Sequence, residues 1–133
     1  ENNMGLDMFV WRVKANDAIS DFVIRSEEDG REGSLNELFY WRKHHDLHGW
    51  MEKLYRNKGG TAQTFNCVPV RLYSHDLDAL QFDLLNNMLP VTRGFFFGEN
   101  PPDAKSLKGD LKFIQKARDA IAAGDAVYYD SWW

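Results

Sequence analysis

The densest group of side chains that could do chemistry lies between residues 41 and 48 of the 133-residue chain. Trp41, Arg42, His45 and His48 bring an indole, a guanidinium and two imidazoles into this short segment. An arginine can hold a phosphate or carboxylate through two parallel hydrogen bonds, and a tryptophan offers a plane on which a base or ring can stack. Imidazoles can donate to anions or transfer protons near neutral pH. These residue types therefore favour a surface that binds an anionic, ring-bearing ligand.

Two further candidates lie far away in the sequence. Arg93 directly precedes the run GFFFG at residues 94–98 and could make a second contact to an anion. Trp132 belongs to the closing run YYDSWW, and tryptophan and tyrosine are common anchors of interfaces. This aromatic end could equally dock against the core of its own domain. We expect the ligand-binding surface to comprise Trp41, Arg42, His45, His48, Arg93 and Trp132.

The cluster at residues 41–48 permits three other interpretations. It could be a solvated or partly covered face that binds nothing. In an enzymatic interpretation, His48 or His45 is the general acid–base and Arg42 stabilises charge on a nucleotide or phosphoester. In a metal-binding interpretation, His44 and His48, which are one helical turn apart, coordinate the same metal ion. The run lacks the His-Glu-x-x-His order of metalloproteases. We expect binding rather than catalysis, with no metal and no cofactor, and we assign no catalytic residue.

The segment that positions this cluster is predicted to be one helix over residues 34–57. Ser34 and Glu37 have the spacing of a capping box, and Gly59 and Gly60 follow as stop signals. At about 100° per residue, Trp41, Arg42, His45 and His48 fall on the face opposite the apolar stripe. The predicted helix therefore gathers all four side chains on one surface.

The remaining elements are predicted from apolar runs and cap residues. Short apolar or aromatic runs indicate strands at residues 8–13, 22–25, 65–73 and from 126 onward. Apolar stripes at helical spacing indicate helices at residues 75–88 and 103–123. Cys67, the only cysteine, is expected as a small buried hydrophobe in the third strand and excludes an intramolecular disulfide. The fold class is predicted as α+β, a single compact domain with a small mixed or antiparallel sheet packed by about three helices.

Composition sets limits on the class of protein. Sixteen basic and twenty acidic side chains leave a net charge of −4, which argues against intrinsic disorder and against a nucleic-acid binder driven by bulk charge. No apolar run approaches the roughly 20 residues of a membrane span, and no signal peptide is evident. We expect a soluble protein of a reducing compartment, with residues 4–133 as its single domain. Residues 1–3 are expected not to belong to the natural protein, whose first residue we expect to be Met4.

Four sequence blocks resemble a family of small proteins encoded by tailed bacteriophages and prophages. MGLDMF at residues 4–9 is similar to the family's MGLDMYL, and YWRKHHDLHGW at 40–50 is similar to YWRKxNxIHxWF. LPVTRGFFFG at 89–98 resembles LPTxxGFFFG, and YDSW at 129–132 resembles YxSSW. The blocks keep the family's order, although His45 stands in place of its usual Asn and Asp130 in place of a Ser. The resemblance implies an origin in a phage, and it implies no reaction.

Together these observations predict a phage accessory protein in the cytoplasm of the infected bacterial host. It is expected to bind a host or defence-related partner, or a phosphorylated small molecule, without engaging a membrane and without a role in nucleic-acid binding. A homodimer would be one way to build a pocket from so small a domain. The alternatives are a small nucleotide- or phosphoester-processing enzyme and a pure protein–protein interaction module.

Overall fold

The chain folds around a four-stranded antiparallel sheet. The computed structural model describes residues 5–25, 35–42, 44–90 and 104–133. Within these ranges the strand order is β4-β1-β6-β5, and every neighbouring pair is antiparallel. The strands are β1 (Asp7–Val13), β4 (Leu35–Arg42), β5 (Val70–Leu72) and β6 (Ala126–Trp132). A small second sheet pairs β2 (Ala18–Ser20) with β3 (Val23–Ile24).

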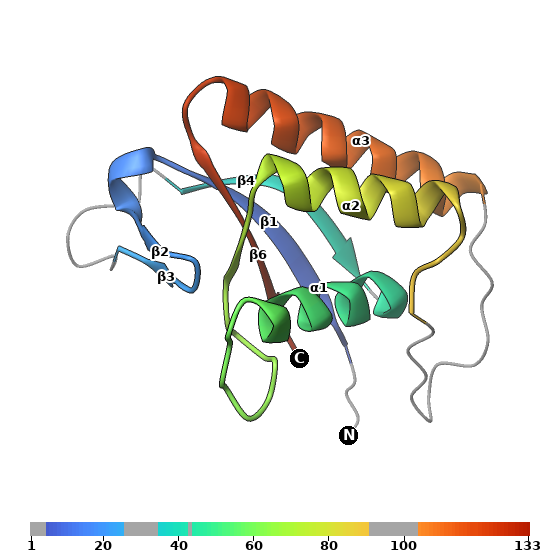
Figure 1. Ribbon diagram of the computed structural model, residues 1–133, viewed down its shortest axis with the longest axis horizontal. Coiled ribbons are helices and arrows are strands. Elements are labelled where there is room, and N and C mark those ends of the chain that lie inside the picture. Colours follow the sequence, from blue (N-terminus) through green and yellow to red (C-terminus); the bar gives the residue numbers. More distant parts are fainter. Residues whose placement is uncertain (1–4, 26–34, 43, 91–103) are drawn as a thin grey trace.

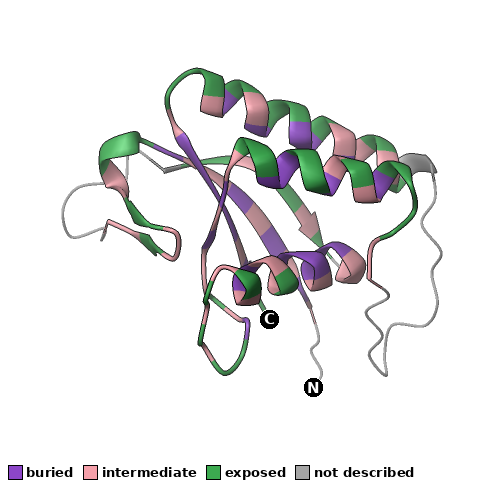
Figure 2. Cartoon of the chain, viewed as in Figure 1, coloured by how far each residue is buried: buried purple, intermediate pink, exposed green. Residues whose placement is uncertain are grey.

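Three helices cover one face of the four-stranded sheet (Figure 1). They are α1 (His45–Asn57), α2 (Ser74–Leu85) and α3 (Ala104–Ala122). Buried residues lie along β1 and β6 and on the sides of the helices that are turned toward the sheet (Figure 2). The predicted α+β class, with three helices on a small antiparallel sheet, is therefore confirmed.

The main core lies between the sheet and the helices. Met8 and Val10 of β1 and Tyr129 of β6 have no exposed surface, and they pack in one cluster with helix residues such as Met51 and Leu80. Strand residues alternate between the two faces of a sheet, so Phe9 between Met8 and Val10 belongs to the other face. The helix-covered face thus takes every second residue of β1 and β6.

The β2–β3 hairpin covers one end of the second face. Tyr128, the neighbour of Tyr129 in β6, donates its hydroxyl hydrogen to the Ser20 carbonyl of this hairpin. A small cluster of Val13, Ala126 and Tyr128 packs there against Trp11, Ala18 and Ile24. In the part of the chain that the structure describes, no α-helix lies on this second face; a 3-10 helix, η1 (Ala15–Asp17), leads into the hairpin (Figure 1).

The predicted single helix over residues 34–57 is wrong. Residues 35–42 form β4 and pair with β1, and the helix begins only at His45. The ring of His44 takes the cap position, where its Nδ1 accepts a hydrogen bond from the Leu47 amide. Aromatic residues such as those at 39–41 fit a sheet well, and pairing with β1 outweighs the local capping signal of Ser34 and Glu37.

The predicted strand over residues 65–73 is shorter than expected. Only Val70–Leu72 pairs with β6, which fits the presence of Pro69, a residue that cannot donate to a ladder. The expectation of a buried Cys67 is also wrong, because this residue is exposed and has a positive φ of 60°. Its backbone amide still donates to the Ser131 carbonyl, which attaches the loop to the edge of β6.

Candidate functional site

The change from helix to strand separates the predicted site residues. Trp41 pairs with Met8 and Arg42 pairs with Asp7 in the β4–β1 ladder. Because Met8 faces the helices, Trp41 points into the helix-covered face and Arg42 points to the other one. Two neighbours that share a surface on the predicted helix therefore lie on opposite sides of the sheet.

Trp41 is part of a polar cluster under the helices. Its indole nitrogen donates to Asp110 Oδ1 of α3 at 3.1 Å, and His44 Nε2 lies 2.7 Å from Asp110 Oδ2. Asp110 is 2% exposed, and the other ring nitrogen of His44 accepts the Leu47 amide hydrogen. Nε2 of His44 must then be the nitrogen that donates to the carboxylate. The cluster joins β4, the start of α1 and α3, so its role is to hold these elements together.

His48 lies in the core rather than on a surface. It is 8% exposed, and its Nδ1 is 2.6 Å from the hydroxyl oxygen of Tyr129. Burial, with a smaller contribution from the charge of His45, lowers the pKa of His48 to about 4. The rings of Phe65 and Trp133 pack against the imidazole. His48 is therefore a neutral structural group with no direct access to a ligand.

The two remaining predicted site residues are His45 and Arg93, and the structure describes only the first. His45 is the first residue of α1 and is partly buried, close enough to His48 to lower its pKa. Arg93 lies outside the described residues.

Arg42 and Trp132 do share a surface. Asp7 of β1 pairs with Arg42 on one side and with Trp132 on the other, so the three residues form one row across the sheet. Since neighbouring strands lie about 4.8 Å apart, the backbones of Arg42 and Trp132 are about 10 Å apart. The next row on the same face consists of Tyr40, Phe9 and Asp130.

Aromatic side chains dominate this face. The ring centroids of Phe9 and Trp11 are 5.3 Å apart in a stacked pair, and those of Phe9 and Tyr40 are 5.4 Å apart. Trp132 is 65% exposed and Tyr40 is 44% exposed. We name the residues of these rows, together with Trp11, the open sheet face: Asp7, Phe9, Trp11, Tyr40, Arg42, Asp130 and Trp132.

The charged groups of the open sheet face are few and mixed in sign. Arg42 is exposed and has no ion-pair partner among the described residues. Asp7 accepts a hydrogen bond from the Tyr40 hydroxyl, and this bond is the main cause of a raised pKa of Tyr40. Burial raises the pKa of Asp130 to about 6, against the opposing effect of the Ser131 amide that donates to it. Arg42 thus lies near the carboxylates of Asp7 and Asp130.

An aromatic face of this kind is unusual for the uncovered side of an antiparallel sheet. Such a side is normally polar, which gives the strand a clean alternation of apolar and polar residues. Residues 7–13 of β1 read DMFVWRV, with apolar side chains at Phe9 and Trp11 as well as at the helix-facing positions. That broken alternation was the signal that could have identified Phe9 and Trp11, whereas Tyr40 of β4 joins them through its register with Phe9.

The described residues contain neither a membrane-spanning helix nor a metal cluster. No helix in residues 44–57, 74–85 or 104–122 is long and apolar enough to cross a bilayer. Within the described ranges, no three His, Cys, Asp or Glu side chains lie together as a metal ion would require. No protein-family model, curated protein or solved structure matches the chain.

Proposed function

We propose that this chain acts as a binding protein whose open sheet face captures a partner protein. The observation that carries the proposal is a sheet face with exposed Trp132 and Tyr40 beside an exposed Arg42 that forms no ion pair with the described residues. Tryptophan, tyrosine and arginine are the residues most enriched among those that dominate the binding energy of interfaces.

The charges of the face also favour a protein over a polyanion. Arg42 is flanked in its own row by Asp7, and Asp130 lies in the next row. Two carboxylates would repel a nucleic-acid backbone, whereas a protein surface can present complementary charges to all three groups. The resemblance to phage and prophage proteins suggests the kind of partner, namely a host or defence-related protein in the cytoplasm of an infected bacterium.

A second candidate is capture of a phosphorylated small molecule. The observation in its favour is the shared row of Arg42 and Trp132, about 10 Å apart across β1. Arg42 would hold the phosphate and Trp132 would stack on the ring. The enzymatic alternative has less support, because a buried His48 with a pKa of about 4 is poorly suited to proton transfer at neutral pH.

The test uses four forms of the full chain as bait in a bacterial lysate: wild type, Trp132→Ala, Arg42→Ala and the control Phe82→Ala. Phe82 is 60% exposed on α2, so the control removes an equally accessible ring from the helix layer. A captured protein is purified, and its affinity for each form is measured. We expect Trp132→Ala to weaken binding roughly tenfold or more and Phe82→Ala to leave it unchanged.

Three results would count against the partner-protein proposal. Equal binding by Trp132→Ala and wild type would overturn the assignment of the face. A dimer of the chain that dissociates on Trp132→Ala would identify a second copy as the occupant. In native mass spectrometry with linear and cyclic nucleotides, a stoichiometric adduct that disappears on Arg42→Ala would favour the small-molecule candidate instead.

A further inference from the structure

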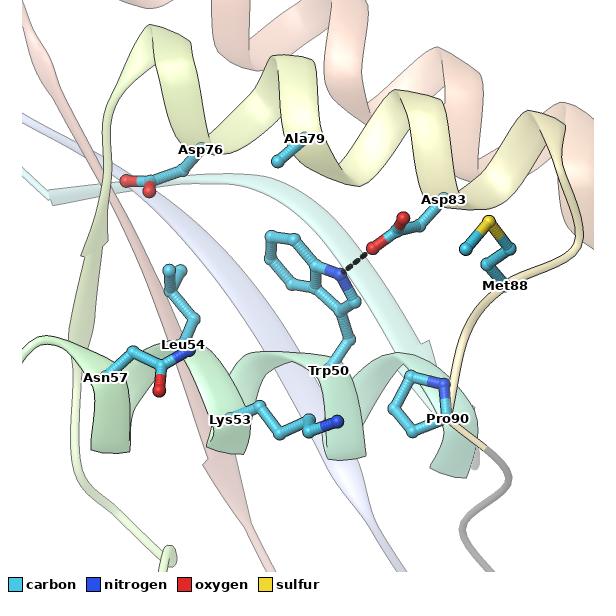
Figure 3. A pocket seen from close by; sticks show the side chains of 9 residues that line it. All are labelled: Trp50, Lys53, Leu54, Asn57, Asp76, Ala79, Asp83, Met88 and Pro90. Carbon is cyan, nitrogen blue, oxygen red and sulfur yellow. Dashed lines mark hydrogen bonds between the residues drawn. The ribbon is translucent and has the colours of Figure 1, made fainter.

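A cleft of about 350 Å³ opens between α1 and α2, on the opposite side of the molecule's sheet from the open sheet face (Figure 3). Its volume lies within the usual range for small-molecule sites. Side chains from both helices and from the segment after α2 line it, among them Trp50, Lys53, Leu54, Ala79, Asp83 and Met88.

Trp50 gives the cleft its shape. Its indole extends from α1 toward α2, where Nε1 donates to Asp83 Oδ2 at 2.8 Å (Figure 3). The ring keeps the two helices apart, and the small side chain of Ala79 leaves the neighbouring space open. Trp50 is 9% exposed, so it is a fixed apolar wall rather than a mobile cover.

Two charged side chains that line the cleft are not neutralised by the described residues. Lys53 has no ion-pair partner among them. Asp83 uses one carboxylate oxygen for Trp50, and its other oxygen has no hydrogen-bond partner in the described part of the chain. Asp76, at the other end of the cleft, differs because Lys58 Nζ lies 2.9 Å from its carboxylate.

We propose that this cleft binds a small zwitterion, a free amino acid with an apolar side chain. The ligand's ammonium group bonds to the free oxygen of Asp83, and its carboxylate bonds to the ammonium of Lys53. The apolar side chain packs against Trp50 and Leu54. A simple cation would be repelled by Lys53 and a simple anion by Asp83, so the pair of opposite charges selects a ligand that carries both.

The test follows the indole N–H resonance of Trp50 by NMR while leucine is added. The matched probes are leucinamide, which lacks the carboxylate, and N-acetyl-leucine, which lacks the ammonium group. Leucine should shift the resonance in a saturable way, and each matched probe should bind roughly tenfold more weakly or worse, since each loses a charge-assisted hydrogen bond. Glycine, which lacks the apolar side chain, should also bind more weakly than leucine.

Two variants test the residues themselves. Asp83→Asn keeps an oxygen for the Trp50 N–H and replaces the other carboxylate oxygen with an uncharged NH2 group, and Lys53→Gln removes the opposite charge. Each should weaken leucine binding roughly tenfold. Asp78→Asn on α2 and Lys108→Gln on α3 are the matched controls, because neither residue lines the cleft, and they should bind leucine as wild type does.

Three results would overturn the proposal. They are the absence of a saturable shift at millimolar leucine, equal binding of leucine and leucinamide, and wild-type affinity in Asp83→Asn. None of them bears on the open sheet face, because the cleft lies in the helix layer and shares no residue with that face.

Discussion

The two faces of the sheet use similar residue types in opposite ways. On the helix-covered face, Trp41 donates to Asp110, and His48 contacts the hydroxyl of Tyr129. On the open sheet face, Arg42 has no ion-pair partner among the described residues, and Trp132 is 65% exposed. Similar side chains thus contact other groups of the protein on the helix-covered face and remain available to a binding partner on the open sheet face.

The difference teaches that position in the strand, more than residue type, decides which polar or aromatic side chain can bind. Trp41 and Arg42 are adjacent in the sequence, as are Tyr129 and Asp130, yet each pair is divided between the faces. A buried tryptophan or histidine must satisfy its polar atoms inside the protein. An aromatic side chain on the uncovered face has its ring free for a partner.

The largest expected effect comes from truncating neighbours on opposite faces of β1. Met8→Ala should cost about 3 kcal/mol of unfolding free energy, because it leaves a cavity in a fully buried site. Phe9→Ala should cost about 1 kcal/mol, mainly from loss of its contacts with Trp11 and Tyr40. Urea denaturation of both variants measures the difference. Equal costs would mean that both faces of the sheet are packed to the same degree and would contradict the conclusion that the open sheet face is uncovered.

The next effect is a pH dependence of opposite sign on the two faces. The pKa of His48 falls to about 4 on folding, so its stabilising contribution is full above pH 6.5 and is lost as the pH falls toward 4. The pKa of Asp130 rises to about 6, so its contribution is full below pH 3.8 and is lost as the pH rises through 6. Between pH 4 and 6.5 the two dependences oppose each other, and these two groups together should leave the wild-type stability nearly flat.

Asp130→Asn separates the two dependences. At pH 7.5 the variant should be more stable than wild type by about 2 kcal/mol, because it removes a partly buried charge and keeps an oxygen that can accept the Ser131 amide hydrogen. The gain should disappear at pH 4, where the stability of the variant declines with protonation of His48. Thermal unfolding across this range checks the prediction. A gain that persists unchanged at pH 4 would show that Asp130 does not titrate as its pKa requires.

Most of the fold could be predicted from local sequence signals. The strand of residues 8–13, the two later helices and the final strand agree with β1, α2, α3 and β6 within a few residues. The failure at residues 35–42 has a specific cause. Ser34 and Glu37 satisfy a helix-capping pattern, while the evidence for a strand is the ladder with β1, a pairing of residues about thirty positions apart. No local pattern reports such a pairing.

Of the six residues predicted to form one surface, the described structure places Arg42 and Trp132 in the same row of the sheet. Arg42 and Trp132 lie on one face of the sheet, although the argument that proposed Arg42 relied on a helix that does not exist there. Trp41 and His48 were assigned to the same face of that predicted helix, but both are enclosed in the packing of the helix-covered side, where each has a hydrogen-bond partner. Phe9 could be recognised from the broken alternation of β1, but Tyr40 could be recognised only from the register of β4 against β1, in which it pairs with Phe9.

A smaller effect is expected from removing one hydroxyl on each face. Tyr129→Phe should cost about 1 to 2 kcal/mol, because it leaves Nδ1 of the buried His48 without its partner. Tyr40→Phe should cost less, because this hydrogen bond is exposed and water can replace the Tyr40 hydroxyl as the donor to Asp7. Chemical denaturation at pH 7.5, where His48 is neutral in both forms, measures the two costs. A larger cost for Tyr40→Phe would reverse the comparison of the faces.

Trp132→Ala should have the smallest effect on stability and the largest effect on partner binding. Trp132 is 65% exposed at the end of β6, so Trp132→Ala should change the unfolding free energy by no more than about 0.5 kcal/mol. Trp133→Ala is the control at the neighbouring tryptophan. The Trp133 indole donates to the Phe65 carbonyl and packs against His48, so its loss should destabilise the fold more than the loss of Trp132. If the open sheet face is the binding surface, partner affinity should follow the opposite order, with Trp132→Ala the weaker binder. If Trp132→Ala lowers both stability and partner affinity, the Trp132 ring is part of the packing of the domain. A residue that serves only to bind a partner contributes little to the stability of the unbound fold.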